Sequence, residues 1–137
     1  MKRILFIYLS LIFSMSCQNK SKNDISIDKT FQGFLFKFNN DSIFQKARVK
    51  FPICSIELES ENFTELHRNV DRKHYKLINL TENKTDQKRE GFTQKIKLDK
   101  NKATIEIRGI ENGIMGDYYF EKINGKWYLV GWSDVST

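Results

Sequence analysis

The stretch Asp117-Tyr118-Tyr119-Phe120-Glu121-Lys122-Ile123-Asn124-Gly125-Lys126-Trp127-Tyr128-Leu129-Val130-Gly131-Trp132, near the carboxyl end, decides the fold. At its centre, Asn124-Gly125 separates two runs that are rich in aromatic and β-branched residues. This dipeptide is the strongest short signal for a two-residue β-hairpin, because both turn positions need positive φ. We therefore expect antiparallel strands over residues 117–123 and 126–132.

The turn also predicts which side chains of this hairpin share a face. An uninterrupted register pairs Lys122 with Trp127, Phe120 with Leu129 and Tyr118 with Gly131 on one side. On the other side it pairs Glu121 with Tyr128, Tyr119 with Val130 and Asp117 with Trp132. The first set is typical of a core. The second combines aromatic rings with carboxylates, so we expect an aromatic strand face on which Tyr119, Tyr128 and Trp132 are candidate binding residues.

The segment before this hairpin predicts a second one. Apolar and polar residues alternate over 92–98 and again over 103–108, which is the period of a strand with one buried face. Folding the two runs over residues 99–102 sets Leu98 against Ala103 and Ile96 against Ile105. Both apolar rows then fall on one face and both charged rows on the other. We expect a half-solvated antiparallel hairpin.

Helical periodicity appears earlier in the chain. Within residues 28–40, Phe31, Phe34, Leu35 and Phe38 recur at helical spacing and form one apolar stripe, with Asp28 as the expected cap. A shorter helix is expected from Asp41 or Ser42 to Arg48, with Ile43, Phe44 and Ala47 as its apolar positions.

The middle of the chain is less regular. Residues 49–53 alternate like a strand, and Pro52 restricts that run to an edge or to a strand beginning. Residues 59–69 are ambiguous, 75–80 predict a strand, and 81–90 predict a long polar loop. Cys54 lies in an apolar run and is expected to be a small buried side chain.

Two helices followed by antiparallel strands predict an α+β domain in which a curved antiparallel sheet wraps the amino-terminal helices. The ending 125–132 (GKWYLVGW) resembles the last strand of nuclear-transport-factor-two-like, or cystatin-like, α+β rolls. The segment 41–53 (DSIFQKARVKFPI) is similar to one in a family of Bacteroidota lipoproteins with a domain of unknown function and the same roll. The resemblance implies the roll, but no activity.

Members of this roll superfamily bind apolar ligands between sheet and helices, and a few are enzymes. An enzyme of that kind needs a carboxylate with a shifted pKa in an apolar pocket. Asp117 is the candidate catalytic residue for such an isomerase, dehydratase or hydrolase; the alternative is a solvated carboxylate at a strand end. Gln45 and Arg48 are candidate ligand-binding residues, or else they fasten the second helix to the sheet.

Other classes of function receive little support. His67 and His74, with Glu61 and Glu65, lack the tight ligand pairs of a zinc site. We expect no metal and no cofactor. The chain carries a net charge of +6, but its basic residues form no stripe interleaved with aromatics, so nucleic-acid binding is not expected.

The amino-terminal end predicts export. Met1 to Arg3 form a positive region, and the apolar stretch 4–13 is shorter than the ~20 residues that a membrane-spanning helix needs. Ser14, Ser16 and Cys17 follow, then a polar segment. The arrangement resembles the bacterial lipoprotein signal, in which cleavage precedes a cysteine that carries a diacylglyceryl group. An ordinary secretory signal with a coincidental cysteine is the alternative.

Together these patterns predict a signal peptide (1–16), a lipidated Cys17 with a polar tether (17–27) and one roll domain (28–137). We expect an outer-membrane lipoprotein that faces the periplasm or the cell surface. Its expected role is a non-enzymatic module that binds a ligand, a protein partner or a second copy of itself through the aromatic strand face.

Overall fold

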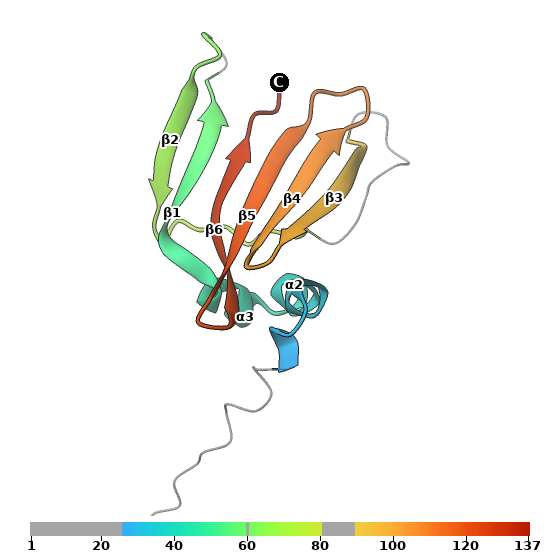
Figure 1. Ribbon diagram of the computed structural model, residues 1–137. Helices are drawn as coiled ribbons and strands as arrows, with labels where there is room; N and C mark the ends of the chain where they lie inside the picture. The colour runs from blue at the N-terminus through green and yellow to red at the C-terminus, as the bar shows by residue number, and fades with distance from the viewer. Residues whose placement is uncertain (1–25, 60, 81–89) are drawn as a thin grey trace, which may run out of the picture.

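The computed structural model describes residues 26–59, 61–80 and 90–137. The elements are α2 (Phe31–Asn40), α3 (Ser42–Ala47), β1 (Val49–Leu58), β2 (Glu65–Val70), β3 (Phe92–Asp99), β4 (Lys102–Gly109), β5 (Met115–Ile123) and β6 (Lys126–Asp134). The strands form one six-stranded sheet in the order β2-β1-β6-β5-β4-β3. Both helices lie at one end of this curved sheet (Figure 1). The predicted α+β class with a curved sheet and amino-terminal helices is confirmed, but β1 pairs with β6 in parallel, so the sheet is not wholly antiparallel as predicted.

An aromatic core joins the helices to the sheet. Phe31, Phe34, Leu35 and Phe38 of α2 are all buried, as the helical stripe predicted. The ring of Phe120 on β5 lies 5.2 Å from that of Phe31, 5.8 Å from that of Phe34 and 5.6 Å from that of Phe38. We call the face of the sheet that packs on the helices the inner face, and the opposite face the outer face.

The β3–β4 hairpin has the predicted register. Leu98 lies opposite Ala103, and Ile96 lies opposite Ile105. Ala103 and Ile105 are buried on the inner face. The charged rows therefore lie on the outer face, because side chains alternate along a strand.

The β5–β6 hairpin follows the prediction only near its turn. Phe120 lies opposite Leu129 as expected, but Tyr119 then lies opposite Gly131, and Tyr118 opposite Trp132. The register shift leaves Val130 as an extra residue on β6 with no partner on β5, which is the arrangement of a β-bulge. The predicted pairs Tyr118–Gly131, Tyr119–Val130 and Asp117–Trp132 are wrong. Trp132 consequently lies on the inner face with Tyr118, away from Tyr119.

Two predictions about helix capping have different outcomes. Asp41 caps α3 as expected, because its Oδ1 accepts a hydrogen bond from the Phe44 amide at 2.9 Å. Asp28 does not cap α2. Helix α2 begins later, and Thr30 accepts the hydrogen bond from the Gly33 amide. Asp28 is instead buried at the end of the sheet, where it makes the contacts described below.

Strand β1 is longer than predicted and lies inside the sheet between β2 and β6. Its register against β6 shifts between Val49 and Cys54, so Pro52 lies where ladder pairing is interrupted. The expectation that Cys54 is buried is wrong: its side chain is exposed. Ile53 and Ser55 are fully buried on the inner face, and strand alternation therefore turns Cys54 outward.

The segment 75–80 is not a strand, contrary to expectation. It crosses behind β6 and β5 on its way to β3 (Figure 1). Side-chain amides make the backbone hydrogen bonds that a neighbouring strand would make. Gln45 accepts from the Ile78 amide at 2.9 Å and donates to the Ile78 carbonyl at 2.8 Å. Asn39 likewise accepts from the Leu80 amide. The ambiguous segment 59–69 contributes β2, and the predicted polar loop 81–90 lies outside the described residues except for Glu90.

Candidate functional site

The part of the inner face that the helices do not cover is also filled with side chains. Tyr75 is buried, with its ring 5.4 Å from that of Phe51 and 6.3 Å from that of Trp132. Burial raises the pKa of the Tyr75 hydroxyl, which donates a hydrogen bond to Gln45 Oε1 at 3.1 Å. The segment 75–80 thus occupies space in which a roll of this kind could enclose a ligand.

Three of the open depressions on the described surface have volumes of about 310, 260 and 440 Å³. One lies beside α3 and Ile78, one beside Phe63 and the carboxyl end, and one beneath the β4–β5 turn. None of these three is lined by Asp117, Tyr119, Tyr128 or Trp132.

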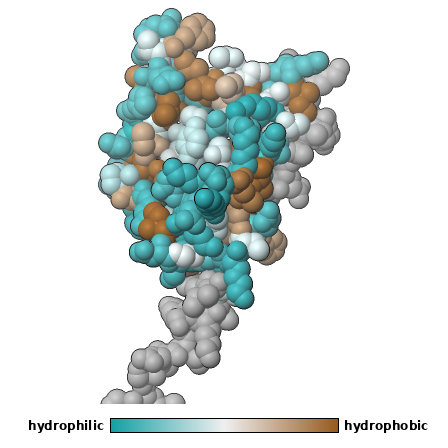
Figure 2. All heavy atoms as spheres, in the orientation of Figure 1, coloured by the Kyte–Doolittle hydropathy of each residue, from teal (hydrophilic) through white to brown (hydrophobic). Residues whose placement is uncertain are grey.

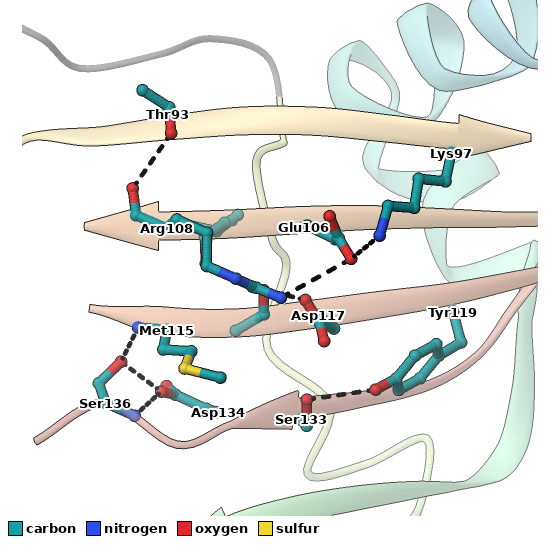
Figure 3. A network of polar contacts seen from close by, with 12 residues as sticks. Thr93, Lys97, Glu106, Arg108, Met115, Asp117, Tyr119, Ser133, Asp134 and Ser136 are labelled. Atoms are coloured by element: carbon teal, nitrogen blue, oxygen red, sulfur yellow. Dashed lines mark hydrogen bonds and ion pairs between the residues drawn. The ribbon is translucent and has the colours of Figure 1, made fainter. Parts of the chain in front are cut away.

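Asp117 lies on the outer face of β5, opposite Glu106 and Ser133. Its carboxylate accepts a hydrogen bond from Arg108 Nη1 at 2.7 Å, and its side chain is 21% exposed (Figure 3). This ion pair raises the pKa of Arg108. A carboxylate neutralised by a guanidinium on an open face is arranged as a structural ion pair.

The ion pair belongs to a chain of charges across three strands. Lys97 Nζ lies 2.6 Å from Glu106 Oε1, and Arg108 Nη2 lies 3.8 Å from that same oxygen (Figure 3). The hydrogen bond from Lys97 lowers the pKa of the Glu106 carboxyl group. Arg108 also donates to the carbonyls of Ile107 and Gly116, so its guanidinium is fixed in place.

The three aromatic candidates do not form one face. Tyr119 lies on the outer face, with its hydroxyl 3.4 Å from Ser133 Oγ. Tyr128 lies near the turn, where the ammonium of Lys50 is 4.4 Å from its ring centroid and the guanidinium of Arg48 is 5.4 Å from it. Trp132 packs on the inner face against Tyr75. The bulge at Val130 places Trp132 on the face opposite to Tyr119, whereas Tyr128 precedes the bulge and keeps its predicted pairing with Glu121.

Gln45 and Arg48 are both buried and occupied by internal contacts. Gln45 Nε2 also donates to the Phe38 carbonyl at 2.9 Å. Arg48 forms a two-pronged ion pair with Asp28, at 2.8 Å and 3.2 Å. These contacts correspond to the alternative in which the two side chains fasten the second helix to the sheet.

The two histidines lie apart and carry separate partners. His67 Nε2 is 3.7 Å from Glu65, and His74 Nδ1 is 2.8 Å from Asp71. Among residues 26–59, 61–80 and 90–137, no group of three or more His, Cys, Asp or Glu side chains is placed to bind a metal ion.

The outer face has an apolar half and a charged half, and the two meet on β5, where Asp117 lies between Met115 and Tyr119. Register places Cys54 beside Gly131 and Tyr119, and Ile56 beside Ser133 and Asp117. The Val135 amide bonds to the Met115 carbonyl at 2.9 Å. We define the outer apolar patch as Cys54, Ile56, Leu58, Met115, Tyr119 and Val135. The charged half is the Lys97–Glu106–Arg108–Asp117 chain. Figure 2 shows this face, with hydrophobic side chains gathered at the upper left over β1 and β2.

Sequence reasoning missed this patch and the role of Asp28. A signal for the patch existed: Cys54, Ile56 and Leu58 alternate, and a strand over 49–58 with Ile53 inward turns all three outward. No comparable local signal identified Asp28, because its partner is twenty positions away.

Within the described part of the chain, no helix is both long enough and apolar enough to cross a bilayer.

Comparisons with known proteins agree with this architecture. A protein-family model matches residues 29–136, nearly the whole described domain. The chain is similar to a cystatin-like protein from Bacteroides caccae, at 27% identity and a TM-score of 0.57, over 75% of this chain and 74% of that one. It is also similar to a protein from Bacteroides uniformis, at 25% identity and a TM-score of 0.58, over the same shares of the two chains.

An NTF2-like protein from Bacteroides fragilis shares the fold at 22% identity and a TM-score of 0.57. The match covers 78% of this chain but only 47% of that protein, so this chain spans about half its length. No curated protein shows significant similarity to the chain.

Proposed function

We propose that this chain is a lipid-anchored binding module of the bacterial envelope. It belongs to the family whose model matches residues 29–136 and has the NTF2-like, cystatin-like fold. In this proposal, Cys17 carries the lipid and the outer apolar patch contacts another protein. The proposal contains no reaction, since Asp117 is neutralised by Arg108 and lines none of the three depressions.

The single observation that carries the binding role is the outer apolar patch itself. Met115 is 45% exposed and Tyr119 is 36% exposed, on a sheet face that neither helix covers. Cys54, between them and β2, is exposed as well. Exposed apolar side chains that share one face with charged and polar neighbours are typical of a contact site on a protein surface.

The shape of this surface favours a protein over a small molecule. Small ligands bind in concavities that cover most of their surface, whereas the patch lies on the open side of the sheet and the inner face is filled by Tyr75 and Trp132. The neighbouring chain of charges provides fixed donors and acceptors at the border of the patch. Such groups set the orientation of a partner more than they raise its affinity.

Photo-crosslinking in the native host tests the binding role. With p-benzoylphenylalanine at position 119, we expect a discrete adduct with one envelope protein or with a second copy of the chain. The same probe at Thr93, on the charged half of the outer face, should give none. Met115→Lys should abolish the adduct and Lys95→Met should not. Equal labelling from positions 93 and 119 would contradict the proposal.

The anchor is supported by the residues before the described domain: a positive start, a short apolar stretch, small residues and Cys17. Two or more acyl chains give lasting membrane attachment, because each buried methylene contributes ~0.8 kcal/mol. The intact mass of the membrane-extracted protein tests it. We expect the mass of residues 17–137 plus a diacylglyceryl group, and Cys17→Ser should abolish processing. The mass of the uncleaved chain would refute the anchor.

A further inference from the structure

The charges of the described residues are divided unequally between the two ends of the molecule. Residues 26–50, 99–102 and 122–128, which form the helical end, carry nine basic side chains and three carboxylates. The remaining described residues carry seven basic side chains and eleven carboxylates. The helical end is therefore strongly positive, with a net charge of +6 against −4 for the rest. The basic residues concerned are Lys29, Lys37, Lys46, Arg48, Lys50, Lys100, Lys102, Lys122 and Lys126.

Two of the three carboxylates of the helical end are already occupied, and the third, Asp99, lies in the β3–β4 turn rather than on a helix. Asp28 is buried against Arg48, and Asp41 caps α3. Neither α2 nor α3 contains an acidic residue. The outward surface of the helices is thus basic, with no free carboxylate of its own to compensate the lysines.

The same helices expose two large apolar side chains. Phe36 on α2 is 73% exposed, and Ile43 on α3 is 81% exposed. The buried side of α2 is formed by Phe31, Phe34, Leu35 and Phe38, so helical geometry directs Phe36 to the opposite side. Apolar residues among lysines on a helix surface are characteristic of helices that lie in the interface of a membrane.

The chain enters the domain at this end. The first described residues, drawn in blue, lie next to α2, and the carboxyl terminus lies at the far end of the sheet (Figure 1). Asp28 is fixed to the sheet: its Oδ1 accepts from the Trp127 amide at 2.9 Å, and its carbonyl accepts from Lys122 Nζ at 2.7 Å. Between Cys17 and Asp28 the chain reaches at most about 35–40 Å, at ~3.3–3.6 Å per residue.

We infer that the surface made by the outward sides of α2 and α3, which we call the helical face, docks on an anionic phospholipid bilayer. The lysines supply attraction to lipid phosphates and Phe36 and Ile43 enter the interface. This inference rests on the proposed lipid anchor, which keeps the helical face close to the bilayer. Docking would turn the opposite end of the sheet away from the membrane and leave the outer apolar patch accessible.

Lysine footprinting of the full lipidated chain tests this orientation. The protein is reconstituted in vesicles of phosphatidylcholine alone, or with one third phosphatidylglycerol, and labelled with an amine-reactive ester. On the anionic vesicles we expect Lys29 and Lys46 to react about fivefold more slowly than on the neutral ones. Lys95, on the outer face of β3, should react at the same rate on both. Raising the salt to 0.5 M should remove most of the difference, since it screens exposed charges.

A matched pair of variants checks the apolar contribution. Phe36→Ser combined with Ile43→Ser should reduce the protection of Lys46 by half or more. Phe63→Ser removes an equally exposed ring from the β1–β2 end, where it is 69% exposed, and should change nothing.

The outcomes separate the two proposals. If the intact mass shows that the chain carries no lipid, the proposed anchor is refuted, and the docking inference that rests on it is refuted too. A lipidated chain whose Lys29 and Lys46 react equally on both kinds of vesicle overturns the docking alone. Equal protection of these lysines in detergent solution without vesicles would assign the helical face to a protein contact and overturn the inference too.

Discussion

Asp28 and Arg48, twenty positions apart, form a buried two-pronged ion pair at the junction of the helices and the sheet. The same carboxylate accepts from the Trp127 amide on β6, and the guanidinium donates to the Trp127 carbonyl. One pair of side chains therefore ties together the start of the domain, the end of α3 and the last hairpin.

Removing one member of this pair should be costly. Asp28→Ala leaves a buried guanidinium without its counter-ion, and we expect the free energy of unfolding to fall by about 3–5 kcal/mol. Urea titration measures it. The control is Asp99→Asn, which removes an exposed charge at the β3–β4 turn and should cost about 0.5 kcal/mol or less. If both variants lose the same free energy of unfolding, the buried ion pair stabilises the fold no more than an exposed charge does.

The amide of Gln45 should protect one backbone group selectively. Gln45→Ala removes both hydrogen bonds to Ile78, so we expect rapid hydrogen exchange at the Ile78 amide and a loss of about 2–4 kcal/mol, because each unsatisfied buried group costs ~1–3. Asn39→Ala should instead free the Leu80 amide and leave that of Ile78 protected. Unchanged exchange at Ile78 in Gln45→Ala would show that another group protects it.

The bulge at Val130 predicts different roles for two aromatic residues. Trp132→Ala should lower the free energy of unfolding by roughly 2–4 kcal/mol, because the ring is part of the inner packing against Tyr75. Tyr119→Ala, on the open outer face, should cost about 1 kcal/mol or less but abolish the crosslink from p-benzoylphenylalanine placed at Cys54, in the same patch. Thermal unfolding and the crosslinking yield together check this. If Tyr119→Ala proves the more destabilising, the assignment of faces is wrong.

The ion pair between Glu106 and Lys97 makes the stability of the fold depend on pH, and stability is lost at low pH. Lys97 lowers the pKa of this carboxyl group below its ordinary value of 4.5. A lowered folded-state pKa contributes stability that is complete above about pH 4.5 and is lost as the pH falls through the folded value. Carboxyl-detected NMR titration should find the Glu106 pKa closer to 4.5 in Lys97→Ala. The control Lys126→Ala, at the other hairpin, should leave it unchanged.

Local signals determined most of the elements. The Asn124-Gly125 turn and the alternation over 92–108 specify hairpins from neighbouring residues alone, and the spacing of Phe31, Phe34, Leu35 and Phe38 specifies a helix stripe. The site was predicted less well. Tyr119, Tyr128 and Trp132 were grouped by an uninterrupted register, and one extra residue at Val130 was enough to place Trp132 on the opposite face.

What the sequence determined by itself was the α+β class, the hairpins and the apolar stripe of α2, because these depend on turn conformation and side-chain period over a few residues. The tertiary structure alone decided that Asp28 bonds to Arg48 rather than capping a helix, that Gln45 replaces a strand beside Ile78, and that Cys54 faces outward. Each of these outcomes depends on a partner or a neighbouring strand distant along the chain, and on the energetic cost of leaving a buried polar group unpaired.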